Sequence, residues 1–358
     1  MKLVFVALFG VFAAFSWSSV PSYYQLSTGV QGLRNLLRLP QSDIDNCIEA
    51  YKFFQSGRYG FGDAHEGETA AETEHVRSYY TVLHEVLAVA DIEKMYIPPQ
   101  IDAKQGLYVN QLLTEEQLLE TLNVSSDSTL LDIGCGRGRI AHHMATMTGG
   151  KVSGFNIDEG QILNGIAYAK ETGFEDRLDL KVGDHHLPFA YPDESFDGSY
   201  SFQAIWPFFK KHELDGVSRE IFRVLKPGAK FSCSEYLLTP DFDHSNPHHV
   251  HLHKLFLPTL AATQSNYPKD VTDALERAGF KLVLSAPSVA PAWPITDQKT
   301  DLFLFFRGII IGLNRIGVLP EWVEKLVNNL LLGGVAWADA EKAKIADLNW
   351  RIIVQKPF

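Results

Sequence analysis

The chain has 358 residues, and its 32 lysines and arginines against 43 aspartates and glutamates give a formal net charge of -11. This acidic balance excludes the basic surface that nucleic-acid binding needs. The length allows a sizeable core, and three cysteines do not form a disulfide framework of the kind found in small secreted domains.

Residues 1–20 are an apolar segment that follows a short basic start, Met1-Lys2. The apolar run is shorter than the roughly 20 residues that a membrane-spanning helix needs. The run ends at Ser18-Ser19-Val20, so the whole segment resembles a secretory signal. A cleaved signal, an uncleaved anchor and a helix lying in the membrane interface all fit this pattern.

Residues 21–110 are predicted to form a helical N-terminal lead that caps a substrate. A helix is expected to start near Gln41, and another is expected around Ser78–Ala90. A third helix is predicted over Leu113–Leu122, because Thr114 with glutamine three residues later matches a capping box.

A glycine-rich turn follows the next apolar run, residues 129–133. The run carries Asp132 and leads directly into Gly134, Gly136 and Gly138, which gives the pattern D-x-G-x-G-x-G. Glycines let the backbone approach a ligand and adopt positive φ values. The spacing differs from the dinucleotide fingerprint G-x-G-x-x-G. It resembles the cofactor loop of S-adenosylmethionine-dependent methyltransferases.

Strands and helices are expected to alternate from this run onward. Further strands are predicted at Lys151–Asn156, Leu178–Val182, Phe196–Phe202, Ala229–Tyr236, Phe280–Ser285 and Trp350–Gln355, and helices at Arg137–Met147, Glu159–Thr172, His212–Leu225 and Tyr267–Gly279. This alternation predicts an α/β fold with a parallel sheet and helices on both faces.

Polar side chains stand at four of the predicted strand ends: Asp132, Asn156, Asp184 and Gln203. Ligands of such sheets bind beyond the carboxyl ends of the strands. Asn156 is expected to bind a ribose, and Asp184 an adenine amino group. One strand-end acid alone is more often a cap or turn former, but four in order around a glycine loop predict a cofactor site.

Two later segments have open interpretations. Residues 239–254 hold five histidines, including His249. Imidazole is a common metal ligand, but no spacing matches a zinc pattern. We therefore expect no metal here. We expect a polar loop that enters a helix over the mouth of the active site.

Residues 287–349 are rich in Leu, Ile and Phe, and fit a helical lid, a membrane-resting face or an extra core layer.

From about Tyr59 to the C-terminus, the chain resembles the sterol C-methyltransferases, relatives of sterol 24-C-methyltransferase. The stretches that carry the resemblance are LDIGCGRGRIAHHM, GFNIDEGQI, GDHHLPF, FDGSYSFQA, EIFRVLKPGAKFSCSEY, TPDFDHSNPHH and WRIIVQKP. Asn156 is the most specific match, because most methyltransferases carry an acid there. The family pattern Glu-Ala-Thr-Cys-His after the fourth strand is replaced by Gln203-Ala204-Ile205-Trp206-Pro207.

The resemblance implies a Rossmann-like, seven-stranded class I methyltransferase fold with N-terminal helices and a helical insert before the last strand. The cofactor-binding core is expected at residues 111–286, and a sterol methyltransferase-like C-terminal region at 287–358. The implied ligands of S-adenosyl-L-methionine are Asp132, Gly134, Cys135, Gly136, Gly138, Asn156, Gln161, Asp184, His185 and Gln203.

The implied activity is methyl transfer to a carbon of a sterol or related triterpenoid. Methylation of an alkene forms a carbocation, which needs aromatic or carboxylate groups and a base. Catalytic candidates are Tyr59, His65, Glu66, Gln203 and His249. Further aromatic candidates are Phe61, Tyr200 and Trp206, and further bases are Asp63 and Glu235.

An intracellular cofactor and few cysteines favour an uncleaved anchor on the cytosolic face of the endoplasmic reticulum membrane. A cleaved signal leading into the secretory pathway is the alternative. A small-molecule N- or O-methyltransferase and a non-catalytic lipid-binding protein of the same fold also fit the sequence. Assembly into a homo-oligomer also fits the sequence.

Overall fold

The computed structural model describes residues 34–35, 38–55, 69–89, 93–292, 308, 311–312, 314–317 and 321–358. The predicted N-terminal anchor lies outside the described residues. So do the candidates Tyr59, Phe61, Asp63, His65 and Glu66. Among the described residues, no helix is both long enough and apolar enough to span a bilayer.

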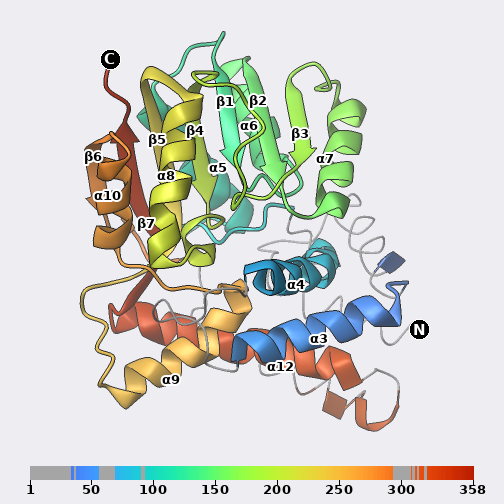
Figure 1. Ribbon diagram of the computed structural model, residues 1–358. Helices are drawn as coiled ribbons and strands as arrows, with labels where there is room; N and C mark the ends of the chain where they lie inside the picture. Colours follow the sequence, from blue (N-terminus) through green and yellow to red (C-terminus); the bar gives the residue numbers. More distant parts are fainter. Residues whose placement is uncertain are drawn as a thin grey trace.

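A seven-stranded sheet forms the centre of the molecule, with the order β3-β2-β1-β4-β5-β7-β6 (Figure 1). The strands are β1 (Thr129–Ile133), β2 (Lys151–Asn156), β3 (Leu178–Val182), β4 (Phe196–Phe202), β5 (Leu225–Leu238), β6 (Lys281–Ala286) and β7 (Ala346–Gln355). Strands β1 to β5 pair in parallel, whereas β7 runs antiparallel to both β5 and β6. The predicted seven-stranded methyltransferase fold is thus confirmed, and β7 makes its sheet a mixed one.

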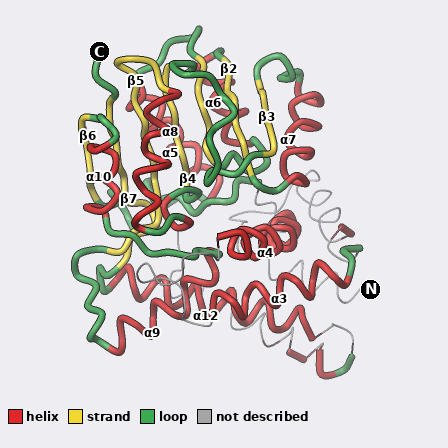
Figure 2. The backbone as a smooth tube through the Cα atoms, in the orientation of Figure 1, coloured by secondary structure: helices red, strands yellow, loops and turns green. Residues whose placement is uncertain are grey.

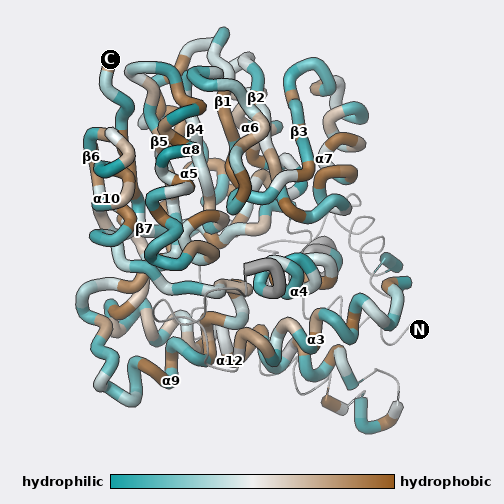
Figure 3. Tube along the Cα trace, viewed as in Figure 1, coloured by the Kyte–Doolittle hydropathy of each residue, from teal (hydrophilic) through white to brown (hydrophobic). Residues whose placement is uncertain are grey.

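Each face of the sheet buries apolar side chains under its own helices. Helices α8 (Leu214–Val224) and α10 (Pro268–Arg277) cover one face, and α5 (Leu107–Leu122), α6 (Arg139–Thr148) and α7 (Glu159–Thr172) cover the other. Neighbouring residues of a strand point to opposite faces: Leu131 packs in the first core and Leu130 in the second. Figure 3 shows hydrophobic residues gathered along the central strands.

A second layer of helices lies beyond the carboxyl ends of the parallel strands (Figure 2). It contains α3 (Gln41–Gln55), α4 (Thr69–Val89), α9 (Pro247–Phe256) and α12 (Glu321–Lys342). In α12, Val323 packs with α3 and α4. Trp337 stacks edge-on against Phe256 of α9, with ring centroids 4.8 Å apart. Helix α12, the longest described part of the apolar insert, therefore adds an extra core layer.

Several predicted boundaries move for local reasons. Helix α5 begins at Leu107, and Thr114 lies inside it, where its hydroxyl donates to the Asn110 carbonyl at 2.7 Å. The predicted capping box at Thr114 is therefore wrong. Helix α6 begins only at Arg139, because Gly138 has a φ of 66° and forms its N-cap. Helix α7 matches its prediction: the Asp158 carboxylate caps it by accepting from the Gln161 N–H at 2.8 Å.

Candidate cofactor and acceptor site

The glycine turn after β1 needs glycine for two separate reasons. Gly134, Gly136 and Gly138 all have positive φ values, between 53° and 78°, which side chains disfavour. A Cβ at Gly134 would also lie 2.4 Å from the Ala204 Cβ, and one at Gly138 would lie 2.6 Å from a Leu180 methyl carbon. Gly134 and Gly138 thus allow close packing, and Gly134 and Gly136 also line a pocket.

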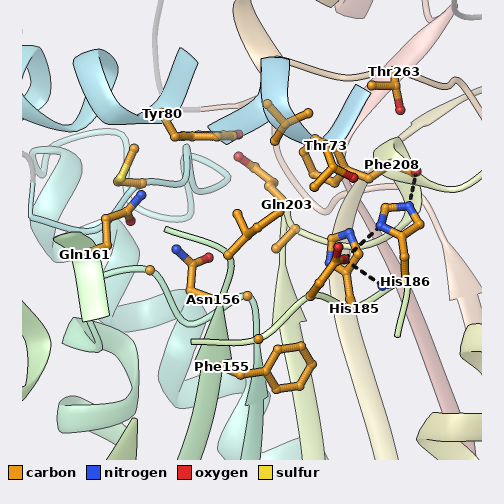
Figure 4. A pocket seen from close by; sticks show the side chains of 18 of the residues that line it. Thr73, Tyr80, Phe155, Asn156, Gln161, His185, His186, Gln203, Phe208 and Thr263 are labelled. Atoms are coloured by element: carbon orange, nitrogen blue, oxygen red, sulfur yellow. Dashed lines mark hydrogen bonds and ion pairs between the residues drawn. The ribbon is translucent and has the colours of Figure 1, made fainter. Parts of the chain in front are cut away.

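The pocket lies between the carboxyl ends of the strands and α4 (Figure 4), and encloses about 820 Å³ of space not filled by atoms, its open mouth included. Seven of the predicted cofactor residues line it: Gly134, Gly136, Asn156, Gln161, Asp184, His185 and Gln203.

The other three predicted cofactor residues, Asp132, Cys135 and Gly138, are not part of the pocket wall. Asp132 is 2% exposed and accepts a hydrogen bond from the Tyr200 hydroxyl at 3.1 Å. Burial raises the pKa of the Asp132 carboxyl to about 8. Burial also raises the pKa of the Cys135 thiol. Asp132 and Cys135 are therefore buried beside the pocket and do not form part of its surface.

Asp184 and His186 form a partly buried ion pair at the pocket wall. Asp184 Oδ1 accepts from the backbone N–H of His186 at 2.9 Å and lies 3.0 Å from the ring Nδ1. His186 Nε2 lies 2.9 Å from the Phe208 carbonyl, which only a donor can satisfy. Burial lowers the pKa of His186, but hydrogen bonds to Asp184 and Phe208 outweigh the effect of burial. The pKa of His186 is therefore raised above its usual value. Burial raises the pKa of Asp184, but the hydrogen bonds from His186 outweigh burial and lower this pKa to about 2.

His185 differs from His186 in its surroundings. Its ring packs against Phe209, with centroids 4.9 Å apart, and burial lowers the pKa of His185 to about 3. The side-chain ligand atoms of Asp184, His185 and His186 lie within 4.8 Å of one another. However, both ring nitrogens of His186 already have partners, so the geometry of this cluster is that of an ion pair beside a neutral imidazole.

One face of α4 forms the opposite wall of the pocket. Glu72, Thr73, Val76 and Tyr80 all line it, at spacings that place them on one side of a helix. The Tyr80 hydroxyl donates to the Leu260 carbonyl at 3.2 Å. The sequence prediction started this helix only around Ser78, whereas α4 begins at Thr69, so it missed this wall. The recurrence of these side chains every three to four residues is the signal that could have found it.

Residues 130–228 match the family model described as a methyltransferase domain. Sterol 24-C-methyltransferase of Gibberella zeae is 30% identical over 267 residues, which cover 68% of this chain and 69% of that protein. The chain belongs to the sterol C-methyltransferase family. Squalene methyltransferase 1 of Botryococcus braunii is 31% identical over 240 residues, which cover 63% of this chain and 62% of that protein.

This family member is an S-adenosylmethionine-dependent methyltransferase. Its fold is shared with geranyl diphosphate C-methyltransferase of Streptomyces coelicolor, solved with S-adenosyl-L-homocysteine. The TM-score is 0.51 at 14% identity, with 73% of this chain and 86% of that chain covered. The donor set of the pocket fits the cofactor, because Asn156, Gln161 and Asp184 place polar side chains beside the uncovered backbone of Gly136.

Gln203 of this methyltransferase lines the pocket, but its side-chain amide is engaged elsewhere. Its Oε1 accepts from the Ile97 N–H at 3.1 Å, and its Nε2 donates to the Ile97 carbonyl at 2.9 Å and to Asn349 Oδ1 at 3.1 Å. These bonds join the end of β4 to the segment before α5 and to β7. The structure therefore gives Gln203 a role in holding the pocket wall.

Three other candidates of the methyltransferase lie away from the pocket lining. His249 is on α9, where its Nδ1 accepts from the Asp243 N–H at 3.0 Å, and no residue of this helix lines the pocket. Trp206 is fully buried and donates to Cys233 Sγ at 3.2 Å. Glu235 is also fully buried and accepts from the Ala204 N–H at 3.0 Å. Burial raises the pKa of Glu235 to about 7.

These positions correct the roles expected of the buried side chains. Trp206 and Tyr200 are core residues, because neither has exposed surface, and they cannot stack on a substrate. Glu235 fixes the turn after β4 from below through its backbone hydrogen bonds. These interactions replace the substrate-contacting roles that the sequence suggested for the three residues.

Proposed function

We propose that this methyltransferase transfers a methyl group from S-adenosylmethionine to a carbon of a sterol or a related triterpenoid lipid. The observation that carries the proposal is the similarity to both sterol and squalene methyltransferases over most of the chain. The acceptor side of the pocket supports it, because Val76, Met95 and Phe208 give that side an apolar surface. An apolar acceptor gains roughly 25 cal/mol per Å² of surface removed from water.

Within this proposal, Asn156 binds the cofactor ribose and Asp184 binds the adenine amino group. Oδ1 of Asp184 takes both hydrogen bonds from His186, which leaves Oδ2 to accept from the adenine. The bound cofactor supplies an electrophilic methyl group on a sulfonium. Methyl transfer is an in-line displacement, so the pocket residues act mainly by positioning the two reactants.

Incubation of the full-length protein with cofactor labelled in its methyl group and a panel of acceptors tests the proposal. The panel contains sterols with a 24-alkene, squalene, sterols with a saturated side chain and 3-ketosterols. We expect label in an alkene lipid, detected by mass spectrometry of the extracted products. Label only in small polar amines or phenols would replace the proposal with N- or O-methylation. Cofactor and lipid binding without transfer of label would indicate a non-catalytic lipid-binding protein.

We also propose that residues 1–20 hold the protein at the cytosolic face of the endoplasmic reticulum membrane, since an apolar acceptor resides in membranes. A chain that begins at Pro21 should move from the membrane pellet to the supernatant after cell fractionation, and its cofactor affinity should be unchanged. If expression of the whole sequence instead releases into the culture medium a product that lacks residues 1–20, the segment is a secretory signal.

A further inference from the structure

A buried carboxylate faces the acceptor side of the pocket. Glu72 lies in the first turn of α4, is 4% exposed and lines the pocket. Its Oε1 is 3.5 Å from the ammonium of Lys210, which is 2% exposed and follows the short helix at Trp206–Phe208. Two charges removed from water carry a desolvation cost that apolar side chains would avoid. A role at the pocket would explain why the pair is present.

The other candidate carboxylates have different partners. Among the described residues of the pocket lining, the acids are Glu72 and Asp184, and Asp184 is paired with His186 on the cofactor side. Glu235, the acid nearest to the end of β4 in the sheet, is sealed in the core by backbone and Ser201 contacts. Gln203 stands where the family carries glutamate, and its amide is engaged by Ile97 and Asn349.

We propose that Glu72 is the carboxylate that faces the carbocation and accepts its proton when an alkene is methylated. This inference rests on the proposed function. The alkene π electrons form the new carbon–carbon bond to the methyl group, and the electrons of the sulfur–methyl bond stay on sulfur, which becomes a neutral thioether. The positive charge moves to the adjacent alkene carbon. A proton from a carbon beside it passes to Glu72, and the electrons of that C–H bond form the new double bond.

The surroundings of Glu72 suit this role. Val76 lies one turn further along the same face of α4, and Phe208 and Met95 complete an apolar wall, so water is kept from the cation. The Lys210 ammonium balances the charge of the carboxylate before the reaction. Lys210 does not line the pocket, and therefore acts as a positioning residue.

The first test replaces Glu72 by glutamine, which keeps the shape of the side chain and removes its charge. We expect turnover of the best alkene acceptor to fall by about 100-fold or more, as for loss of a general base. Affinity for S-adenosylmethionine, measured by calorimetry, should be unchanged. Glu74→Gln is the matched control, because Glu74 is on the same helix, has a 61% exposed side chain and pairs with Arg77; it should keep wild-type turnover.

The second test measures binding to the wild-type protein, so it is independent of the stability of a variant. An analogue of the alkene acceptor with a tertiary ammonium at the carbon that becomes cationic is compared with its neutral carbon counterpart, with S-adenosylhomocysteine present. We expect the ammonium compound to bind at least 10-fold more tightly, and Glu72→Gln to remove this preference. A purely structural Glu72–Lys210 pair would give no such preference.

The outcomes separate the two proposals. Absence of label from every lipid in the wild-type reaction overturns both the lipid acceptor and the role of Glu72. Wild-type methylation of an alkene, together with undiminished turnover in Glu72→Gln or equal binding of the charged and neutral analogues, overturns the role of Glu72 alone.

Discussion

Replacing Gly136 by valine should strongly weaken the binding of S-adenosylmethionine. Gly136 has a φ of 53° and lines the pocket. A Cβ at this position would already lie 3.2 Å from Gln161 Oε1, and the two methyl groups of valine extend further into the cofactor space. The backbone conformation is also strained for a β-branched residue. We expect the dissociation constant to rise by about 100-fold or more, equivalent to roughly 2.7 kcal/mol, in calorimetric titrations.

The strain and the steric effect can be separated with Gly173→Val. Gly173 ends α7 with a φ of 74°, and a Cβ there would meet no atom within 4 Å. This variant introduces a similar backbone strain outside the pocket lining, so it should unfold at a lower temperature but retain cofactor affinity. Equal cofactor affinity in Gly136→Val and the wild-type protein would contradict the assignment of the glycine turn.

Replacing Trp206 by alanine should destabilise the whole protein. Trp206 is fully buried, packs edge-on against Phe231 with ring centroids 6.2 Å apart, and bonds to Cys233. Loss of a buried tryptophan leaves a cavity and typically costs about 3–5 kcal/mol. We therefore expect the free energy of unfolding, measured by urea denaturation, to fall by about that amount.

Trp206→Phe provides the comparison, since it keeps an aromatic ring in the core and should cost clearly less than the alanine substitution. If Trp206→Ala has the same free energy of unfolding as the wild-type protein but loses lipid turnover selectively, Trp206 contacts the acceptor, as the sequence alone suggested. The two substitutions thus distinguish a core residue from one that contacts the substrate.

The strands near the cofactor were predictable because their signals are local. The strand ranges predicted for β2, β3 and β4 match the structure, since each is an apolar run closed by a turn. The glycine turn was predictable for the same reason: the three positions with positive φ, 134, 136 and 138, are all glycines within one short stretch of sequence. Seven of the ten predicted cofactor residues line one pocket, because the carboxyl ends of parallel strands meet at one edge.

What the sequence could not provide depends on contacts between distant residues. Trp206 follows the end of β4 and Glu235 lies close to the end of β5. Both are near the strand ends where ligands bind, but their burial is decided by strand β5 and the turn after β4. Glu72 lies far from the cofactor motifs in the sequence, and only the placement of α4 beyond the carboxyl ends of the strands brings it to the pocket. Thr114 has the spacing of a helix start, but the helix begins earlier and includes it.

The position of β7 has a consequence for how the chain folds during synthesis. β7 comes last along the chain, yet it lies between β5 and β6 in the sheet. On a ribosome that has not yet released residues 346–358, β6 has no neighbour in the sheet, and β5 has one unpaired edge, because both pair there with β7. The nascent chain can therefore pair β1 to β5 early, but it must keep the exposed edges of β5 and β6 from aggregation until residues 346–355 have left the ribosome.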